Sequence, residues 1–475
     1  MKLVWLRRDL RIEDNRALCS AIESEQPVMA LYIATPETWQ RHGLAPIQAD
    51  LIKRRLVTLQ TDLATINVPL YYAQVDTYQQ AAQLVAEIAK SNSLDGVYFN
   101  KEYEFDEQNR DARLQELLVH AGIAAHSFDD KCALQPGSVL NKQGHYFKVF
   151  TPFKRAYLTR FYQQPISIIR PQPIGEVAQL HGEQAQLFSD NSSFDYPTES
   201  SATYPVDTSS IINQLRDFVA HRSERYSDLR DIPSIEGTSR LSPYLAIGAL
   251  SVRQCMARLH DQHPKPLPPG REMWMSELIW REFYQHLIYF ESKLSKGKCF
   301  LEWGDRLSWR NSSADIDAWK KGQTGYPIVD AAMRQLNHTG WMHNRLRMVV
   351  ASFLIKDLHV DWHVGERYFM SKLVDGDYAA NNGGWQWCAS TGCDGQPYFR
   401  IFNPVSQGER FDPDGEFVCQ WIPELAAVPR KFIHQPWKWS KAKELSYPPP
   451  IVDHKTEREI TLSLYKEAKG NVDGA

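Results

Sequence analysis

The N-terminal part of the chain alternates short apolar runs with longer stretches of helical periodicity. The apolar runs are rich in β-branched and aromatic residues, which favour strands. They cover residues 2–6, 27–34, 69–75 and 96–99. Apolar residues at helical spacing lie between them, over 47–66, 78–90 and 106–120. This alternation predicts a doubly wound parallel α/β sheet from residue 1 to about 130, without the G-x-G-x-x-G turn of dinucleotide folds.

The pattern changes twice further along the chain. Residues 165–207 are rich in Pro, Ser, Gln and Asp and lack sustained periodicity, as a surface connector would. After residue 209 strand signals nearly vanish, and helical patterns continue to about 440. We therefore predict an α/β domain at 1–130, a connector at 131–207, a mostly α-helical domain at 208–450 and a tail at 451–475.

Charge and cysteine content exclude several classes of protein. The 475 residues include 54 basic and 57 acidic side chains, a balance that argues against coating nucleic acid by bulk charge. No apolar run is long enough to span a membrane, and the N-terminus does not resemble a signal peptide. Seven cysteines without a C-x-x-C motif indicate neither a disulfide framework nor a zinc ribbon. We expect a cytoplasmic protein, a monomer without a metal site.

Tryptophan is distributed unevenly. Of 14 tryptophans, all except Trp5 and Trp39 lie between residues 274 and 439. A large helical core explains part of this bias, because large aromatics usually serve burial. The other indoles need a separate explanation.

The segment 236–243 (EGTSRLSP) combines a helix start with phosphate-binding chemistry. Ser242 before Pro243 is typical of an N-cap followed by the first helical position. Hydroxyls of Thr238 and Ser239, the Arg240 guanidinium and free backbone N–H groups would together bind a phosphate.

A second group lies on one predicted helix. Glu277, Trp280, Arg281 and Tyr284 are spaced i, i+3, i+4 and i+7, so they share one face. Either Glu277 and Arg281 pair on a solvated face, or the apolar residues beside them form the wall of a buried polar pocket.

A third group is split between a predicted helix and a predicted loop. Trp341, Asn344 and Met348 align on an amphipathic helix, with Arg347 beside them. The composition of residues 375–387 (DGDYAANNGGWQW) indicates a loop that approaches something closely. Their amides and carboxylates suit the hydrogen-bonding edge of a flat heterocycle.

His359 and His363 have the i, i+4 spacing of a zinc pair. No H-E-x-x-H motif and no third ligand accompany them, so we interpret them as surface histidines flanking Trp362.

Several of these segments together resemble the photolyase and cryptochrome flavoprotein family, most closely the bacterial class I cyclobutane pyrimidine dimer photolyases. The resemblance covers residues 3 to about 450. It rests on WLRRDLR (5–11), EGTSRLS (236–242), WREFY (280–284), GYPIVDAAMRQL (325–336), GWMHNRLRM (340–348) and DGDYAANNGGWQW (375–387).

The resemblance implies an antenna function for the α/β domain and FAD in the helical domain, with an expected Arg347–Asp375 ion pair. Excited, reduced FAD would pass an electron to a pyrimidine dimer flipped out of UV-damaged DNA. The implied FAD-binding residues are Tyr226, Thr238, Ser239, Arg240, Leu241, Ser242, Trp274, Glu277, Arg281, Asn344, Arg347, Asp375, Asp377 and Asn381.

The resemblance also assigns the remaining roles. The catalytic set is Glu277, Asn344, Met348 and Asn381. The dimer and the DNA around it would contact Arg230, Trp280, Arg281, Asn344, Arg345, Trp387 and Arg400. Trp385, Trp362 and Trp309 match a chain of indoles that reduces oxidised flavin.

The antenna assignment depends on four residues. His42, Glu107 and Lys296 match positions that bind 5,10-methenyltetrahydrofolate, which we favour over a deazaflavin. Asp106 stands where similar family members carry Asn, and a second carboxylate beside Glu107 would weaken folate binding.

Four alternatives remain. A (6-4) photolyase would carry a histidine where Asn344 stands, and a signalling cryptochrome would lack the complete dimer-binding set and extend further beyond residue 450. The other two are a flavin-binding module without catalysis and a helical nucleic-acid-binding protein with a structural tryptophan core.

Overall fold

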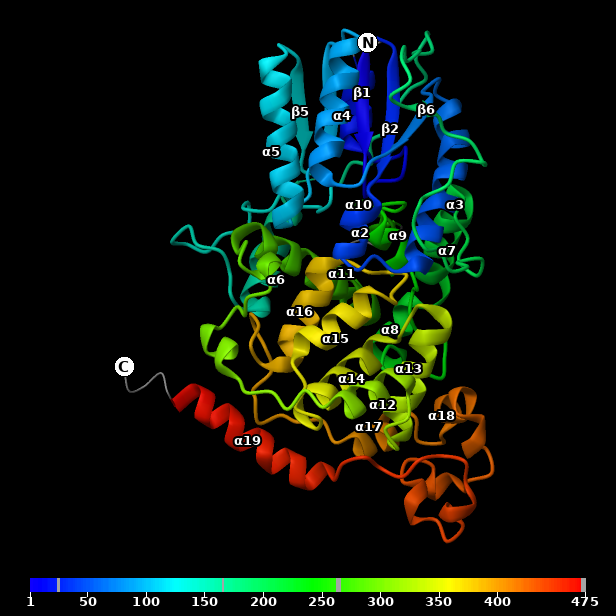
Figure 1. The fold of residues 1–475 in the computed structure, drawn as a ribbon, viewed down its shortest axis with the longest axis vertical. Coiled ribbons are helices and arrows are strands. Elements are labelled where there is room, and N and C mark those ends of the chain that lie inside the picture. The colour runs from blue at the N-terminus through cyan, green and yellow to red at the C-terminus, as the bar shows by residue number, and fades with distance from the viewer. Residues whose placement is uncertain (24–25, 165, 262–265, 471–475) are drawn as a thin grey trace. The chain divides into compact units, whose positions relative to one another are not determined.

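The computed structural model describes residues 1–23, 26–164, 166–261 and 266–470, in two compact units (Figure 1). Unit 1 contains Met1–Glu224, Ser239–Ser292 and Val374–Ala379. Unit 2 contains Arg225–Thr238, Lys293–Leu373 and Ala380–Ala475.

Unit 1 is built on a six-stranded sheet with the order β5-β4-β1-β2-β3-β6. The strands are β1 (Lys2–Leu6), β2 (Val28–Ala34), β3 (Leu70–Gln74), β4 (Gly96–Asn100), β5 (Ala124–Phe128) and β6 (Gln186–Leu187). All pairs are parallel except β3 with β6, and Leu3 of β1 faces Met29 on one side and Val97 on the other. The parallel core arises because β1 to β4 are buried runs of apolar residues.

Helices cover the sheet. The helices of this part are α1 (Arg16–Ile22), α2 (Pro36–Arg41), α3 (Pro46–Ala64), α4 (Tyr78–Ser91) and α5 (Phe105–His120). Side by side, α4 and α5 pack on one face of the sheet, where Val85 and Leu114 join Leu3 and Trp5 in a buried cluster (Figure 1). The predicted fold class is confirmed.

The sequence patterns missed two strands. β5 is an edge strand whose residues are partly exposed, so its apolar signal is weak. β6 has only two residues and lies inside the segment interpreted as a connector, where it pairs with the edge of the sheet through Tyr71 and Tyr72 of β3.

The other regular elements of unit 1 are helices, and one of them is the longest helix of the described chain. The α-helices are α6 (Phe150–Phe161), α7 (Thr208–His221), α9 (Ser242–Ala246), α10 (Val252–His260) and α11 (Pro269–Phe290). α11 contacts both α6 and α10.

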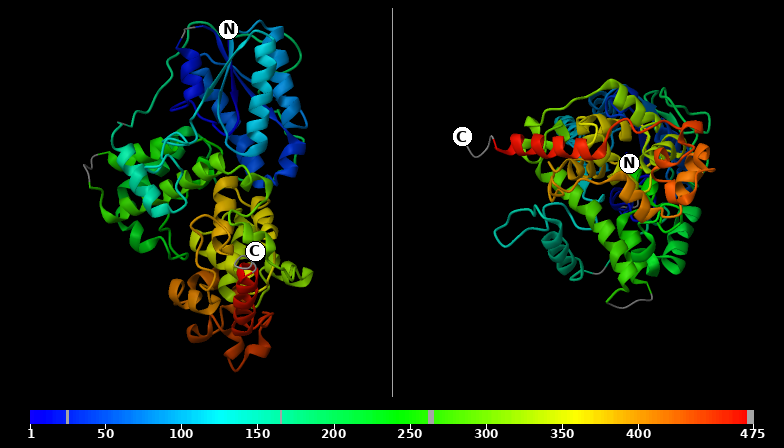
Figure 2. Two further views of the ribbon diagram at one scale, coloured as in Figure 1. Left: turned by 90° about the vertical axis from the view of Figure 1, so that its left-hand side faces the viewer. Right: turned by 90° about the horizontal axis from the view of Figure 1, so that it is seen from below.

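Unit 2 is α-helical throughout its described residues. Its α-helices are α8 (Tyr226–Leu229), α12 (Ser313–Lys321), α13 (Pro327–Thr339), α14 (Asn344–Lys356), α15 (Trp362–Met370), α16 (Tyr378–Ala389), α17 (Pro404–Phe411), α18 (Glu416–Trp421) and α19 (His454–Gly470). α16 begins at the end of unit 1 and continues into unit 2. One large apolar cluster unites α12 to α16, and α19 packs against α14 and the short helix η3 (Glu302–Arg306) (Figure 2). Among the described helices, none combines the length and apolar character needed to cross a membrane.

Candidate functional site

α11 presents two of the predicted indoles within unit 1. Trp274 is buried and packs against Phe218, with ring centroids 4.8 Å apart. Trp280 is half-buried and stacks on Phe150, with centroids 3.7 Å apart and planes 8° from parallel. One face of Trp280 is therefore covered by Phe150.

Arg281 lies in buried, polar surroundings. Its Nη1 donates to the carbonyl oxygen of Lys131 at 3.1 Å. Burial would lower the pKa of Arg281, but the acidic groups around it, with Asp377 first among them, together outweigh this effect and raise the pKa above its ordinary value. These surroundings match the buried polar pocket, one of the two interpretations of this helix face.

Asp377 is fixed from two sides. Gln285 Nε2 donates to both of its carboxylate oxygens, at 3.1 and 3.2 Å, and Lys131 Nζ lies 3.7 Å from Oδ2. Gln48 Nε2 donates to the carbonyl oxygens of Val374 and Gly376, at 3.1 and 3.0 Å. These contacts hold the buried Asp375–Asp377 segment to the rest of unit 1.

A fully buried carboxylate anchors the chain before α6. Glu282 accepts hydrogen bonds from the backbone N–H groups of Ala133 and Leu134 and from the Tyr157 hydroxyl. Its ligand atoms lie within 4.8 Å of those of Cys132 and His286, a grouping that can in general hold a metal. Burial raises the pKa values of Glu282 and Cys132 and lowers that of His286 to about 4, so burial favours the neutral form of all three groups.

The predicted phosphate-binding segment is divided between the units, since Thr238 belongs to unit 2 and Ser239 to Ser242 belong to unit 1. Gln214 Nε2 donates to the carbonyl oxygens of Ser239 and Arg240, and Arg240 has a left-handed φ of 52°. The prediction that Ser242 is the N-cap was wrong by one residue. α9 has five residues and starts at Ser242 with Leu241 as N-cap, so its dipole contributes little.

Tyr226 and two of the predicted DNA-binding arginines lie in unit 2. The Arg230 guanidinium is 5.7 Å from the centroid of the buried Tyr226 ring. Arg345 Nη2 lies 2.9 Å from Asp231 Oδ2, and Arg230 Nε lies 3.7 Å from Oδ1 of the same carboxylate. The two cations are thus clustered, whereas Arg281 is half-buried and belongs to unit 1; Arg400 is exposed.

α14 begins later than the sequence pattern predicts. It starts at Asn344 with His343 as N-cap, and Trp341 precedes it in a turn after Gly340, the left-handed C-cap of α13. The alignment of Trp341 with Asn344 was therefore wrong. Asn344 is exposed and Met348 half-buried.

Arg347, also on α14, donates through Nε to the Met342 carbonyl oxygen at 2.9 Å. Its expected partner Asp375 belongs to the other unit, so the Arg347–Asp375 pair stays a prediction.

Residues 378–387 form a helix, where the sequence predicted a loop. α16 carries Asn381, Trp385 and Trp387, with Trp387 half-buried against the main apolar cluster. Asn381 Nδ2 donates to the Glu366 carbonyl oxygen at 3.0 Å, and Asn382 Nδ2 donates to Glu366 Oε1 at 2.8 Å. These contacts outweigh the low helix propensity of the Asn-Asn-Gly-Gly run.

The three indoles of the predicted electron path all belong to unit 2. Trp385 lies so close to α15 that a Cβ atom on Gly365 would be 2.1 Å from its ring, and Gly365 is one turn from Trp362. Backbone N–H groups of Arg310 and Asn311 donate to the His359 carbonyl oxygen, at 2.8 and 3.4 Å. The segment of Trp309 is therefore tied to the segment that precedes Trp362.

The two histidines near Trp362 differ from the sequence interpretation. His359 is buried, and its Nε2 lies 2.7 Å from Glu457. His363 is half-buried and stacks on Trp362. Only His363 therefore flanks Trp362 near the surface, and the two rings have different carboxylate partners.

Three of the predicted antenna residues meet in unit 1. His42 Nε2 lies 2.9 Å from Asp106 Oδ2, and its Nδ1 lies 3.8 Å from Glu107 Oε1. Burial and neighbouring carboxylates raise the pKa of Glu107, which also accepts a hydrogen bond from Tyr78. Lys296, at the end of the short helix η2 (Leu294–Lys296), belongs to unit 2.

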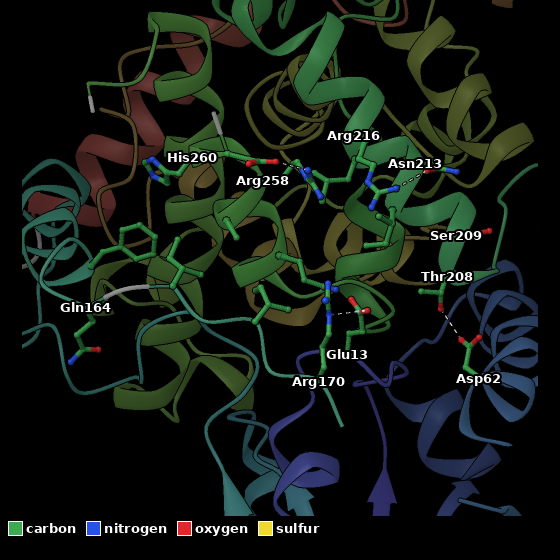
Figure 3. Close-up of a pocket in the computed structure, with 18 of the residues that line it drawn as sticks. Glu13, Asp62, Gln164, Arg170, Thr208, Ser209, Asn213, Arg216, Arg258 and His260 are labelled. Atoms are coloured by element: carbon green, nitrogen blue, oxygen red, sulfur yellow. Dashed lines mark hydrogen bonds and ion pairs between the residues drawn. The ribbon is translucent and has the colours of Figure 1, made fainter. Parts of the chain in front are cut away.

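A further cavity lies elsewhere in unit 1. It has a volume of about 1380 Å³ and is lined by residues of α6, α7 and α10, but by none of the predicted ligand-binding residues that the structure describes (Figure 3). Much of its charge is paired, as in Arg170–Glu13 at 3.3 Å and Arg258–Asp261 at 2.7 Å.

Three residues of the unit 1 site were missed by sequence reasoning. Gln285 follows Arg281 by one helical turn, so the spacing on α11 could have identified it. Lys131 and Phe150 come from the connector, and their role depends on tertiary contacts that no local pattern signals.

The donor groups of the predicted site fit a flavin dinucleotide. Hydroxyls, a phenol and guanidinium groups suit phosphates, while buried carboxylates and amides suit the edge of a flat heterocycle. Neither unit alone contains the whole predicted set.

Comparisons with known proteins extend over nearly the whole chain. Residues 2–173 match the DNA photolyase family, and residues 274–467 match the FAD binding domain of DNA photolyase. The deoxyribodipyrimidine photo-lyase of Vibrio cholerae is 59% identical over 99% of this chain and 100% of its own length, and that of Escherichia coli is 48% identical over 98% of each. A class III photolyase structure from Agrobacterium tumefaciens superimposes with a TM-score of 0.87 at 33% identity, covering 99% of this chain and 98% of that one.

Proposed function

The chain belongs to the DNA photolyase family, and on this premise we propose that it repairs cyclobutane pyrimidine dimers in DNA with light. It is a flavoprotein lyase that binds UV-damaged DNA. The observation that carries this conclusion is the end-to-end similarity to deoxyribodipyrimidine photo-lyases. When bound, reduced FAD supplies on illumination the electron that splits the cyclobutane ring, and then takes it back.

The predicted FAD-binding residues divide into those for its phosphates and those for its isoalloxazine ring. Tyr226 and Thr238 to Ser242 bind its phosphates, with Trp274, Glu277 and Arg281 on α11 beside them. Asn344, Arg347, Asp375, Asp377 and Asn381 orient the isoalloxazine. The Asp377 contacts with Gln285 and Lys131 support this assignment, because they preorganise a charge that would otherwise be costly to bury.

The dimer is bound by stacking and by one carboxyl group. Trp387 and Trp280 stack on the flipped bases, at roughly 1–3 kcal/mol per base. Glu277 hydrogen-bonds the thymine carbonyl edge in its protonated form, and Asn344 and Met348 complete the wall. The Trp280–Phe150 stack supports this role because it fixes the plane of the indole.

Four arginines bind the DNA around the dimer. Arg230 and Arg345 are clustered around Asp231, the exposed Arg400 is available as a further contact, and Arg281 acts beside the dimer itself. Such local clustering allows a chain with a net charge of −3 to bind a polyanion.

Two auxiliary systems accompany repair. Trp385, Trp362 and Trp309 carry electrons that restore reduced flavin. His42, Asp106, Glu107 and Lys296 bind 5,10-methenyltetrahydrofolate as the antenna. The seven cysteines are all free thiols in the structure, which suits a monomer acting in the cytoplasm.

Repair of two lesions under blue light and in darkness tests the proposal. We expect light-dependent repair of cyclobutane dimers and none of (6-4) lesions. Equal repair of both lesions would point to the wrong subfamily, and a flavin-bound protein that repairs neither would point to a cryptochrome-type receptor. Purified protein without flavin absorbance would contradict every flavoenzyme assignment.

Glu277→Ala tests the site itself. We expect a lower quantum yield of splitting by pre-reduced enzyme, because the thymine carbonyl loses its hydrogen-bond donor. Glu272→Ala is the matched control, since Glu272 is an exposed carboxylate on the same helix. Equal yields from the two variants would remove Glu277 from the mechanism.

A further inference from the structure

An imidazole ring lies flat on the middle indole of the proposed electron path. Trp362 is the first residue of α15 and only 1% exposed. The His363 ring covers it, with centroids 3.7 Å apart and planes 26° from parallel. Direct stacking means that the charge of His363 acts on Trp362 at the shortest possible range.

Both ring nitrogens of His363 face hydrogen-bond acceptors. Nδ1 lies 2.7 Å from Asp361 Oδ1, and Nε2 lies 3.0 Å from the carbonyl oxygen of Gly297. A neutral imidazole carries one N–H, so one of these contacts would set a lone pair against an acceptor. The two contacts together select the imidazolium form.

The charged groups around His363 favour the same form. Burial would lower the pKa of His363, but the hydrogen bond and charge of Asp361 outweigh it, Glu366 adds to them, and the pKa is raised. Burial would raise the pKa of Asp361, yet its contacts with His363 lower it, with a smaller contribution from Arg367. Lys296 and Lys298 flank Gly297 in the segment that approaches from the other side.

Asp361 therefore remains ionised while His363 titrates. Its side chain also caps α15 by accepting from the backbone N–H of His363, so it is held in place in both states. When His363 loses its proton, the charge next to Trp362 changes by one full unit.

We propose that His363, as an imidazolium stacked on Trp362, disfavours an electron vacancy on that indole and keeps the vacancy on Trp385 or Trp309. This inference rests on the proposed indole chain. When bound, photoexcited oxidised flavin would supply the acceptor for one electron from Trp385, which would then be refilled from Trp362, and Trp362 from Trp309. After each transfer a single indole carries the radical cation. When that indole is Trp362, its positive charge and that of the imidazolium repel each other.

The consequence is directional. The vacancy does not rest on the middle indole, and its transfer from Trp362 to Trp309 is favoured. Without the charge of His363, the vacancy can remain on Trp362. Replacing Trp309 makes this effect measurable, because the vacancy is then shared between Trp385 and Trp362 alone.

The test compares flavin-loaded Trp309→Phe protein with the double variants that add His363→Gln or His363→Arg. Arginine is a permanent cation that can reach both acceptors, whereas glutamine is neutral. Transient absorption measures how long the flavin–indole radical pair survives. With His363 in place we expect fast recombination at low pH. Above the titration of His363 we expect a lifetime at least about tenfold longer, since one charge in contact with Trp362 is worth at least a decade in equilibrium.

The two double variants should bracket the Trp309→Phe parent, with His363→Arg fast and His363→Gln slow at every pH. Independently of flavin chemistry, the ring resonances of His363 in labelled protein should titrate above about pH 6.5, the ordinary value for histidine. Radical-pair lifetimes that depend neither on pH nor on the residue at position 363 would overturn the inference. A His363 that is neutral at about pH 6 would overturn it as well. If no indole radical forms even with Trp309 present, the electron path itself is wrong, which separates the two failures.

Discussion

The two units hold their predicted functional side chains in different ways. On α11 of unit 1, Arg281 and Asp377 are fixed by a network of buried charges and amides through Lys131 and Gln285. In unit 2, Trp362 and Trp385 are fixed by apolar packing around Gly365 of α15. Polar groups dictate position in one region, and shape dictates it in the other.

The difference matches the roles proposed for the two regions. Groups that hold a charged heterocycle need fixed charges, and these are stable when buried only if every partner is present. Indoles that exchange electrons need close contact, while a nearby charge shifts the energy of each radical cation. His363 stacks on Trp362 and on neither of the other two indoles, which makes its effect specific to the middle of the path.

The largest effect is expected where shape alone decides. Gly365→Ala would place a Cβ atom 2.1 Å from the Trp385 ring, against a side chain that is buried on α16. We expect a loss of about 3 kcal/mol or more in the free energy of unfolding, measured in urea, because overpacking forces the indole and α15 apart.

Gly384→Ala is the matched control for this change. Gly384 lies inside α16, and no atom lies within 4 Å of its would-be Cβ. This variant should gain about 0.5–1 kcal/mol from the better helix propensity of alanine. Equal stability of the two variants would show that Trp385 is not held by shape.

The second effect concerns the polar region. Glu282→Leu leaves the N–H groups of Ala133 and Leu134 and the Tyr157 hydroxyl without their acceptor, and should cost about 2–3 kcal/mol. Glu282→Gln keeps an acceptor oxygen and should cost less. Chemical unfolding of both variants measures the difference, and a Leu variant as stable as the Gln variant would contradict the network.

The comparison of the parent protein with Glu282→Gln also predicts how stability depends on pH. Burial raises the pKa of Glu282, so its protonated form is favoured in the folded state. The stability that this contributes is fully present below the ordinary pKa of a glutamate and is lost as pH rises through the raised value. Gln does not titrate, so the advantage of the parent over Glu282→Gln should shrink as pH increases; an advantage that grows would reverse the assignment.

The two regions differ in how much of their structure could be predicted from the sequence. The strands β1 to β4 and helices α3 to α5 were predictable because buried strands and amphipathic helices have distinct periods. The α11 face was predictable for the same reason, since Glu277, Trp280 and Arg281 follow helical spacing. β5 escaped because an exposed edge strand lacks an apolar run.

Contacts distant in sequence explain the remaining differences. α16 looked like a loop because Asn381, Asn382 and two glycines disfavour a helix, and only their hydrogen bonds to Glu366 reverse that preference. The stacking of Phe150 on Trp280 could not be predicted for the same reason. The same holds for the charged form of His363. Each depends on a partner that the local pattern does not contain.

The third effect separates burial from electron transfer. Trp309→Phe changes a half-buried ring and should cost about 1 kcal/mol, yet remove most photoreduction of oxidised flavin while repair by pre-reduced enzyme persists. Trp319→Phe is the control. Trp319 is fully buried, and its Nε1 donates to the Val350 carbonyl oxygen, so this variant should lose more stability but retain photoreduction. Loss of photoreduction in both variants would mean that packing, and not the path, is being measured.

The smallest effect should come from the exposed edge of the polar region. Asp106 is 42% exposed and pairs with His42, so Asp106→Asn should change the free energy of unfolding by less than about 1 kcal/mol. The substitution removes a carboxylate beside the buried Glu107, and we expect purified protein to retain more folate, measured by its near-ultraviolet absorbance. Glu107→Gln is the counterpart and should retain less. If Asp106→Asn lowers folate retention as well, the second carboxylate is a ligand of the folate in this chain and does not weaken its binding.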